Sequence, residues 1–123
     1  MIFGVGCDLC EVSRIEKTEP RFLERCFTES ERELFSKKHN KAQTVAANFA
    51  AKEALSKALG TGMRGFSFED IEVLRDNLGK PYINVYNGAK EKCEKEGITK
   101  IYVSLSHTDS LAMAYVVLEK ENL

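Results

Sequence analysis

The spacing of hydrophobic positions changes several times along this chain, and each change marks a new element. Residues 2–12 are rich in β-branched and small side chains, which predicts a strand that contains Gly4 and Gly6. Glycine weakens a strand interior, so it often marks a bulge or a place where a ligand or another backbone comes close. Helical spacing follows over about 14–26. The Thr-x-x-Glu pattern of a capping box then starts a helix over about 28–39.

The longest predicted helix runs over about 42–59 and stops at Gly60. Small apolar side chains gather on one arc of it, namely Ala47, Ala50, Ala51, Ala54, Leu55, Ala58 and Leu59. The other arc is polar and contains Asn48, Lys52, Glu53, Ser56 and Lys57, with Phe49 in its middle. A solvated face has no use for phenylalanine, so we expect this side to meet a ligand, a partner or another subunit. The alternative is an ordinary surface pair between Glu53 and Lys57.

After residue 65 the spacing becomes that of strands. Four strands are predicted, at 71–75, 82–86, 101–106 and 111–118. Turn residues at 76–81 join the first two, and a short helix over about 88–95 separates the two hairpins. The order strand, helices, hairpin, helix, hairpin predicts an α+β fold with a mainly antiparallel sheet and one long packed helix.

Composition limits the classes of function. With 123 residues, 43% of them hydrophobic and 30% charged, we expect one globular domain over residues 1–123. A formal net charge of -1 gives no general reason to bind nucleic acid or an anionic membrane. No run approaches a membrane span, and no secretory leader pattern precedes the first strand. We therefore expect a cytoplasmic protein.

The four cysteines are Cys7, Cys10, Cys26 and Cys93, and the first two have the C-x-x-C spacing of metal or redox sites. A structural zinc site normally needs a second such pair, and no histidine stands at finger spacing. Asp-Leu between the first two cysteines is also unlike a thioredoxin-type motif. We interpret the cysteines as buried small hydrophobic residues in a reducing compartment.

Four groups of residues could carry chemistry, although each has a structural alternative. Asp8 is either a metal ligand or a cap at the end of the first strand. Glu53 is either a second ligand or half of the surface pair. The sequence Gly79-Lys80-Pro81 either brings backbone and a cation to a phosphate or is simply a turn. His107 contacts phosphate, shuttles a proton or is a polar turn residue.

Taken in order along nearly the whole chain, these groups closely resemble holo-[acyl-carrier-protein] synthase, the short, single-copy class of 4'-phosphopantetheinyl transferases. The resemblance rests on Gly6-Cys7-Asp8-Leu9 with Arg14-Ile15, Phe49-Ala50-Ala51-Lys52-Glu53-Ala54 with Lys57 and Gly60-Thr61-Gly62, Gly79-Lys80-Pro81, and Ser104-Leu105-Ser106-His107-Thr108. The Asp8 and Lys52-Glu53-Ala54 motifs, at this separation in a chain of this length, are specific together. The resemblance implies a 4'-phosphopantetheinyl transferase-like fold.

The resemblance also implies an activity. This is magnesium-dependent transfer of phosphopantetheine from coenzyme A to a serine of an apo acyl carrier protein, with release of adenosine 3',5'-bisphosphate, in fatty acid biosynthesis. Asp8 and Glu53 would hold Mg2+, and Lys57 would neutralise phosphate oxygens. The implied coenzyme A contacts are Lys57, Gly60, Gly62, Lys80, Pro81 and His107.

The general base that accepts the serine proton stays open between Glu53, Asp8 and a metal-bound water acting through one of them. We favour Glu53 as a metal ligand that shares the base role through water. The catalytic residues implied are therefore Glu53, Asp8 and Lys57.

An acidic carrier protein requires a basic docking surface, for which Arg14, Arg21 and Arg25 are candidates on one predicted helix. The alternative is a mixed charged helix, because glutamates interleave with these arginines. The family further implies a homotrimer with active sites between subunits. Two other classes of function remain open, a non-catalytic carrier-protein binding module and a magnesium-dependent phosphohydrolase acting on a nucleotide.

Overall fold

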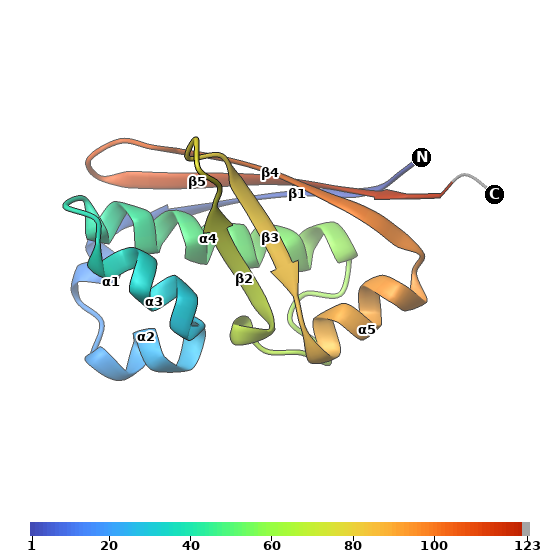
Figure 1. Ribbon diagram of the computed structural model, residues 1–123, viewed down its shortest axis with the longest axis horizontal. Coiled ribbons are helices and arrows are strands. Elements are labelled where there is room, and N and C mark those ends of the chain that lie inside the picture. The colour runs from blue at the N-terminus through green and yellow to red at the C-terminus, as the bar shows by residue number, and fades with distance from the viewer. Residues whose placement is uncertain (122–123) are drawn as a thin grey trace.

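One long helix packs between two antiparallel sheets in the computed structural model, which describes residues 1–121 (Figure 1). The three-stranded sheet has the order β1-β5-β4, and the second sheet is the hairpin β2-β3. In chain order the elements are β1 (Ile2–Glu11), α1 (Val12–Glu16), α2 (Pro20–Cys26), α3 (Glu29–Ser36), α4 (Lys41–Leu59), the 3-10 helix η1 (Phe68–Asp70), β2 (Ile71–Arg75), β3 (Pro81–Val85), α5 (Asn87–Lys95), β4 (Ile98–His107) and β5 (Leu111–Lys120). The predicted α+β fold is confirmed. None of the helices within residues 1–121 is long and apolar enough to cross a membrane.

The single helix predicted over 14–26 is wrong, because the segment forms the two short helices α1 and α2. Pro20 occupies the first turn of α2, where its missing N–H costs no hydrogen bond. Proline disfavours helical backbone in the residue before it, and Glu19 is extended with φ -78 and ψ 157. The chain therefore leaves α1 before Pro20 and starts a new helix there.

The predicted helix boundaries around α3 and α4 are confirmed where a specific residue sets them. The Thr28 side chain accepts a hydrogen bond from the backbone of Glu31, whose carboxylate accepts one from the backbone of Thr28. This reciprocal capping box starts α3. Gly60 ends α4 in the left-handed conformation with φ 81.

The small apolar side of α4 packs directly against β1. Ala54 and Ala58 are buried, and a Cβ on Gly6 or Gly4 would lie 2.1 Å from their respective carbonyl oxygens. Any side chain at these positions would push β1 away from α4. The strand glycines thus mark a close approach of another backbone, one of the alternatives that the sequence left open, and a register shift lies between Ile2 and Gly4.

We expect Gly6→Ala to lower the free energy of unfolding by about 1–3 kcal/mol, because the methyl group overpacks a backbone contact that cannot yield without moving β1. Urea unfolding followed by circular dichroism measures the change. Lys90→Ala, at an exposed position of α5, is the control and should change stability by less than about 0.5 kcal/mol. A Gly6→Ala protein as stable as the control would contradict the packing described for β1.

The polar side of α4 is not one solvated or ligand-facing surface, so that part of the sequence prediction is corrected. Asn48, Lys52 and Ser56 are buried, with 0%, 0% and 1% exposure, because α3, η1 and the β2-β3 hairpin cover this side of the helix. Lys52 forms an ion pair with Glu31 at 2.7 Å (Nζ to Oε1). Its ammonium group also donates to the backbone carbonyls of Cys26, Phe68 and Ile71.

Phe49 lies in an aromatic cluster of the same chain. Its ring centroid is 5.5 Å from that of Phe22 on α2 and 5.1 Å from that of Phe68 on η1. Contact with these two rings stabilises the Phe49 side chain more than exposure to water would. The cluster therefore explains why an apolar residue stands on this side of α4, and no ligand or second protein is needed to explain it.

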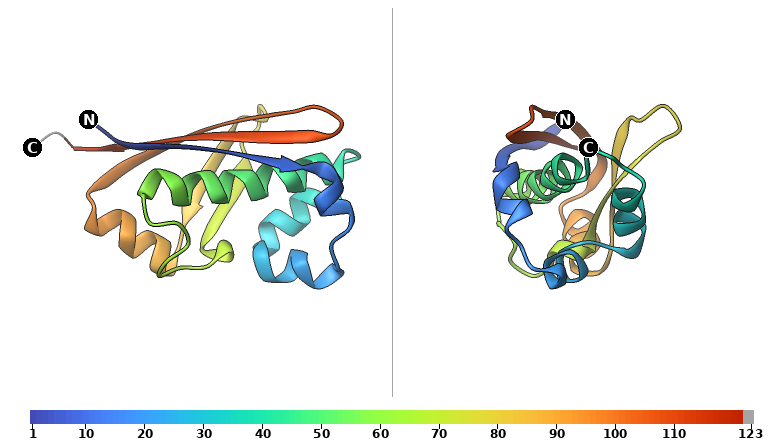
Figure 2. Two further views of the ribbon diagram at one scale, coloured as in Figure 1. Left: turned by 180° about the vertical axis from the view of Figure 1, so that it is seen from behind. Right: turned by 90° about the vertical axis from the view of Figure 1, so that its left-hand side faces the viewer.

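The outer face of the three-stranded sheet is apolar, and both views of Figure 2 place the helices on the opposite side of this sheet. Strand alternation and register bring outward side chains into rows across the sheet, such as Cys7 beside Tyr115 and Leu9 beside Met113. The exposed large apolar residues of this face are Val5, Leu9, Tyr102, Leu111, Met113 and Tyr115. Apolar side chains gathered in this way on a surface are typical of interaction sites.

Candidate functional site

Asp8, Glu53 and Lys57 gather at one side of α4, next to β1. Lys57 Nζ lies 2.9 Å from Asp8 Oδ1 and donates a second hydrogen bond to the carbonyl oxygen of Cys7 at 3.1 Å. Asp8 is on the inward parity of β1, because outward Cys7 and Leu9 flank it. Lys57 thus pairs across the helix–strand contact with Asp8, and not with Glu53 as in an ordinary surface pair.

The electrostatics tie Glu53 to the same group. Burial raises the pKa of Glu53, and the negative charge of Asp8 raises it further, while Lys57 and Arg14 oppose the shift. The pKa of Lys57 is raised by the hydrogen bond that Lys57 donates to Asp8 and by the negative charge of Asp8. The group therefore holds two carboxylates, one of them made harder to ionise by burial, together with the charges of Lys57 and Arg14.

The loop after α4 begins at Gly60, three residues beyond Lys57. Gly60, Gly62 and Gly65 all have positive φ, at 81, 63 and 85. A Cβ added to any of them would meet no heavy atom within 4 Å, so the space around the loop is open. Positive φ explains why these positions are glycine. The open space means that no side chain blocks the predicted approach of a ligand to this backbone.

A second group of predicted residues lies around a pocket of about 220 Å3 at the end of β4. Pro81 and His107 line it, whereas Lys80 lines a neighbouring pocket between β3 and β4. The pocket of Pro81 and His107 is lined by Lys38, Asn40, Thr44, Ala47, Arg75, Gly79, Pro81, Leu105 and His107. We call it the His107 pocket.

Sequence reasoning missed two cations of the His107 pocket, Lys38 and Arg75. Arg75 carried a detectable signal, because the turn at 76–80 closes a hairpin whose register sets Arg75 opposite Pro81. Asp76 accepts hydrogen bonds from the backbone of Leu78 and Lys80 and so fixes that turn. Lys38 carried no such signal, because it lies in the connection between α3 and α4.

Helix α4 separates the two groups within one chain. Thr44 lines the His107 pocket, and Glu53 stands nine positions later on the same helix. Nine residues correspond to about 14 Å of rise and two and a half turns, which puts the two side chains on opposite sides of the helix axis. The fold brings Asp8, Glu53 and Lys57 together, and it brings Pro81 and His107 together, but it keeps these two groups apart.

The three candidate docking arginines are exposed but do not share one helix, which corrects the sequence prediction. Arg14 is on α1, and its charge acts on Glu53. Arg21 and Arg25 are on α2 and stand one i,i+4 step apart. Arg14 is thus associated with the Asp8 and Glu53 group, and the other two form a separate basic pair.

The cysteines form no site in the described chain. All four are free, and within residues 1–121 no cluster of three or more His, Cys, Asp or Glu side chains could hold a metal ion. Cys7 and Cys10 are three positions apart on β1, so they point to opposite faces of the sheet. Cys10 and Cys93 are buried as predicted, but Cys7 is exposed and Cys26 only half-buried.

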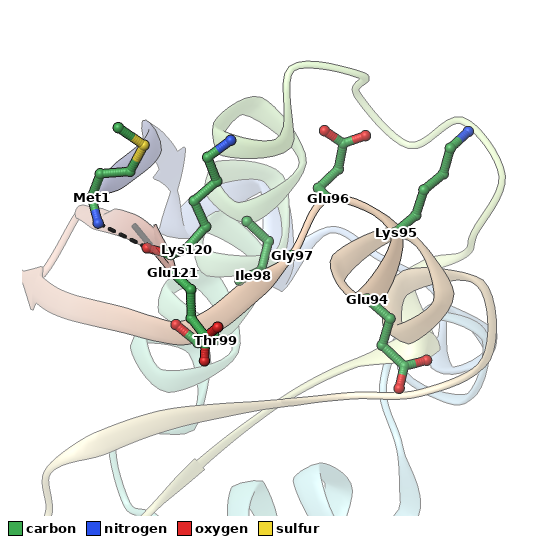
Figure 3. Close-up of a pocket in the computed structure, with 9 residues that line it drawn as sticks. All are labelled: Met1, Glu94, Lys95, Glu96, Gly97, Ile98, Thr99, Lys120 and Glu121. Carbon is green, nitrogen blue, oxygen red and sulfur yellow. Dashed lines mark hydrogen bonds between the residues drawn. The ribbon is translucent and has the colours of Figure 1, made fainter. Parts of the chain in front are cut away.

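A further pocket, of about 540 Å3, lies at the far end of the sheet and is drawn in Figure 3. It is lined by Met1, Glu94, Lys95, Glu96, Gly97, Ile98, Thr99, Lys120 and Glu121. The Met1 amino group donates to the carbonyl oxygen of Lys120 at 2.8 Å, which fastens the start of β1 to the end of β5. None of these nine residues belongs to either predicted group.

Two relatives match this chain over nearly its whole length. A holo-[acyl-carrier-protein] synthase of Clostridium perfringens (strain SM101 / Type A) is 46% identical over 128 residues, covering 98% of this chain and 96% of the relative. One from Clostridium beijerinckii is 48% identical over 122 residues, covering 97% and 98%.

Solved structures agree. The holo-[acyl-carrier-protein] synthase of Neisseria meningitidis superimposes with a TM-score of 0.90 at 36% identity, covering 98% of this chain and 100% of that one. The Bacillus anthracis str. Ames structure, in complex with CoA (3',5'-ADP), gives 0.83 at 41% identity, covering 98% and 99%. The family model described as "4'-phosphopantetheinyl transferase superfamily" matches residues 4–116 of this chain. The chain therefore belongs to this superfamily and is an enzyme of its holo-[acyl-carrier-protein] synthase family.

Proposed function

We propose that the enzyme transfers 4'-phosphopantetheine from coenzyme A to a serine of an apo acyl carrier protein and releases adenosine 3',5'-bisphosphate, in support of fatty acid biosynthesis. The observation that carries this proposal is the convergence of two carboxylates and a lysine, Asp8, Glu53 and Lys57, beside a loop of open glycine backbone. The names of its relatives support it, as do the Bacillus anthracis and Helicobacter pylori structures solved with coenzyme A.

Asp8 and Glu53 fit a magnesium ion. Magnesium usually takes one or two protein carboxylates and completes its octahedron with water and substrate phosphates. Burial and the neighbouring charge of Asp8 raise the pKa of Glu53, so its ionised form would gain from a cation bound beside it. When bound there, the ion would supply neutralisation of the charge that develops on the leaving phosphate.

The protein's own groups would orient the substrates and move one proton. Lys57 keeps 54% of its side chain exposed while it is paired with Asp8, so its ammonium group can also bind pyrophosphate oxygens. The carrier serine oxygen forms a bond to the β-phosphorus, and the bond from that phosphorus to the bridging oxygen breaks. The serine proton passes to Glu53, directly or through one water, and Glu53 suits this role because burial raises its pKa.

The exposed arginines would dock the carrier protein. Arg14 is near enough to act on Glu53, so a carrier held there would present its serine to the reacting phosphate. Arg21 and Arg25 extend the positive surface along α2. Positive side chains around the site would steer an acidic partner even though the whole chain is nearly neutral.

We further propose a homotrimer whose active sites lie between subunits. The Asp8 group and the His107 pocket lie on opposite sides of α4, so one chain cannot close a single site around coenzyme A. A neighbouring copy can supply the missing half. The outer face of the three-stranded sheet offers the apolar surface through which copies would pack.

We expect Tyr115→Glu to dissociate the assembly, because it places a charge in the centre of the apolar sheet face. Light scattering after size exclusion should then give the mass of one chain, while circular dichroism retains the fold. Leu78→Glu, at a turn position that is 95% exposed, is the matched control and should keep the wild-type mass. A wild-type protein that already runs as a monomer would contradict the proposed trimer.

One assay separates this activity from the two other classes of function. The enzyme is incubated with coenzyme A, Mg2+ and apo acyl carrier protein, and the carrier is weighed by mass spectrometry. We expect the mass of the carrier to increase by one phosphopantetheine. Phosphate released from nucleotide without any carrier would support a phosphohydrolase. Tight carrier binding with no chemical change would support a binding module.

A further inference from the structure

A chain of buried hydrogen bonds runs through the core and ends at the His107 pocket. It begins at the ion pair of Lys52 and Glu31. The second carboxylate oxygen of Glu31 accepts a hydrogen bond from Asn48 Nδ2 at 3.0 Å, and Asn48 Oδ1 accepts one from Arg75 Nη2 at 2.8 Å. Arg75 itself lines the pocket. The network therefore connects the most deeply buried charges of the fold to a wall of a surface cavity.

The orientation of Asn48 is fixed by its partners. Its Nδ2 donates both to Glu31 and to the carbonyl oxygen of Val73, at 2.9 Å for the latter. A flipped amide would set its oxygen against those two acceptors and its nitrogen against the guanidinium, and every one of the three bonds would be lost. Asn48 is completely buried, so no water can replace those bonds. Arg75 is thus held at one place by an acceptor that cannot turn.

The guanidinium of Arg75 retains donors for a ligand. Within residues 1–121 its hydrogen bonds go to Asn48 and, at 3.4 Å, to the carbonyl oxygen of Leu74. An arginine has five N–H donors, so most of them are available at the pocket wall. Lys38 and His107 line the same small cavity. Three cationic or protonatable side chains around about 220 Å3 match the charge of a phosphate monoester.

We propose that Arg75 binds the 3'-phosphate of coenzyme A and that Asn48 is the residue that positions Arg75 for it. This assignment rests on the proposed transferase function. Coenzyme A carries two anionic groups, the pyrophosphate and the 3'-phosphate. The pyrophosphate is assigned to Lys57 on the other side of α4, so the 3'-phosphate is the group left for the His107 pocket. Arg75 is then a specificity residue, because it distinguishes coenzyme A from 3'-dephospho-coenzyme A.

Steady-state transfer to the carrier protein, measured with each of these two donors, tests the assignment. We expect Arg75→Gln to raise KM for coenzyme A by about 10- to 100-fold, as loss of a charged hydrogen bond implies, with kcat changed less than about twofold. KM for 3'-dephospho-coenzyme A should stay within about twofold of wild type. Arg75→Lys keeps the positive charge but loses the planar guanidinium, so its KM for coenzyme A should lie between those of the wild type and Arg75→Gln.

Asn48→Ala should show the same donor selectivity to a smaller extent, because Arg75 loses its fixed acceptor. A purely structural role would lower the melting temperature and affect both donors equally. Lys90→Gln removes one positive charge from an exposed position of α5 and serves as the matched control. Arg75→Gln acting equally on both donors, or on neither, would overturn the assignment alone. A wild-type enzyme that transfers from neither donor would instead contradict the proposed function.

Discussion

Replacing Lys52 with methionine is expected to lower the free energy of unfolding by about 3–5 kcal/mol, the cost of leaving one partner of a buried ion pair alone. Lys52 and Glu31 are both 0% exposed, and three backbone carbonyls depend on the same ammonium group. Burial lowers the pKa of Lys52 and raises the pKa of Glu31, and each charge opposes the shift of the other. Methionine keeps the length of the side chain but supplies none of these donors. Urea unfolding of the full chain measures the loss.

The double variant Lys52→Met with Glu31→Gln is the informative control. Glutamine leaves no uncompensated carboxylate and keeps an acceptor oxygen for the backbone donors that Glu31 serves, so the double variant should be more stable than Lys52→Met alone. Lys37→Met, which breaks an exposed pair with Glu33, should cost less than about 1 kcal/mol. If Lys52→Met were as mild as Lys37→Met, the lysine of the Lys52-Glu53-Ala54 motif would not have the structural role described.

Glu53→Gln is expected to lower kcat/KM for carrier modification at least about a hundredfold, since it removes both a metal ligand and the favoured proton acceptor. Asp8→Asn should have a comparable effect and should also weaken the hold on Lys57. Glutamine has nearly the volume of glutamate and removes a charge whose burial is unfavourable, so the melting temperature should not fall. Rates at saturating coenzyme A, with Mg2+ varied, measure the effect.

Glu94→Gln, a carboxylate at the distant pocket of Figure 3, is the matched control and should retain the wild-type rate. A chelator should reduce the wild-type rate to that of the Glu53→Gln enzyme. Full activity of Glu53→Gln at low Mg2+ would exclude Glu53 from both of its proposed roles.

Local signals were sufficient to predict most elements of the fold. The capping box at Thr28 and the stop at Gly60 depend on hydrogen bonds and backbone angles within a few residues, so short sequences encode them. The glycines of β1 signalled a close approach, although the sequence did not tell that the neighbour is α4. Pro20 also carried a local signal, which helical spacing alone overlooked.

The burial of Lys52 was not predictable from periodicity. A helix with one apolar arc indicates one covered side, and lysine normally belongs on the solvated side. The β2-β3 hairpin and α3 cover the second side of α4, and the spacing of residues within α4 carries no sign of either. Only their packing turns Lys52 and Asn48 from surface residues into members of a buried network.

The Asp8 group was predictable as a set because motif resemblance named all three of its residues. The separation of that group from His107 was not, because it depends on which side of α4 each group occupies. Arg75 was missed although the hairpin register places it beside Pro81, because no motif includes it.

Division of the active site between two copies can be tested directly by mixing two defective chains. Glu53→Gln lacks the group on one side of α4, and the double variant Arg75→Gln with His107→Ala lacks the pocket on the other side. Each should be impaired alone at a coenzyme A concentration below the wild-type KM. After co-refolding, we predict that phosphopantetheine transfer recovers well above the sum of the separate activities, because some interfaces combine two intact halves. If verified mixed assemblies transfer no more than that sum, each site is built from a single chain.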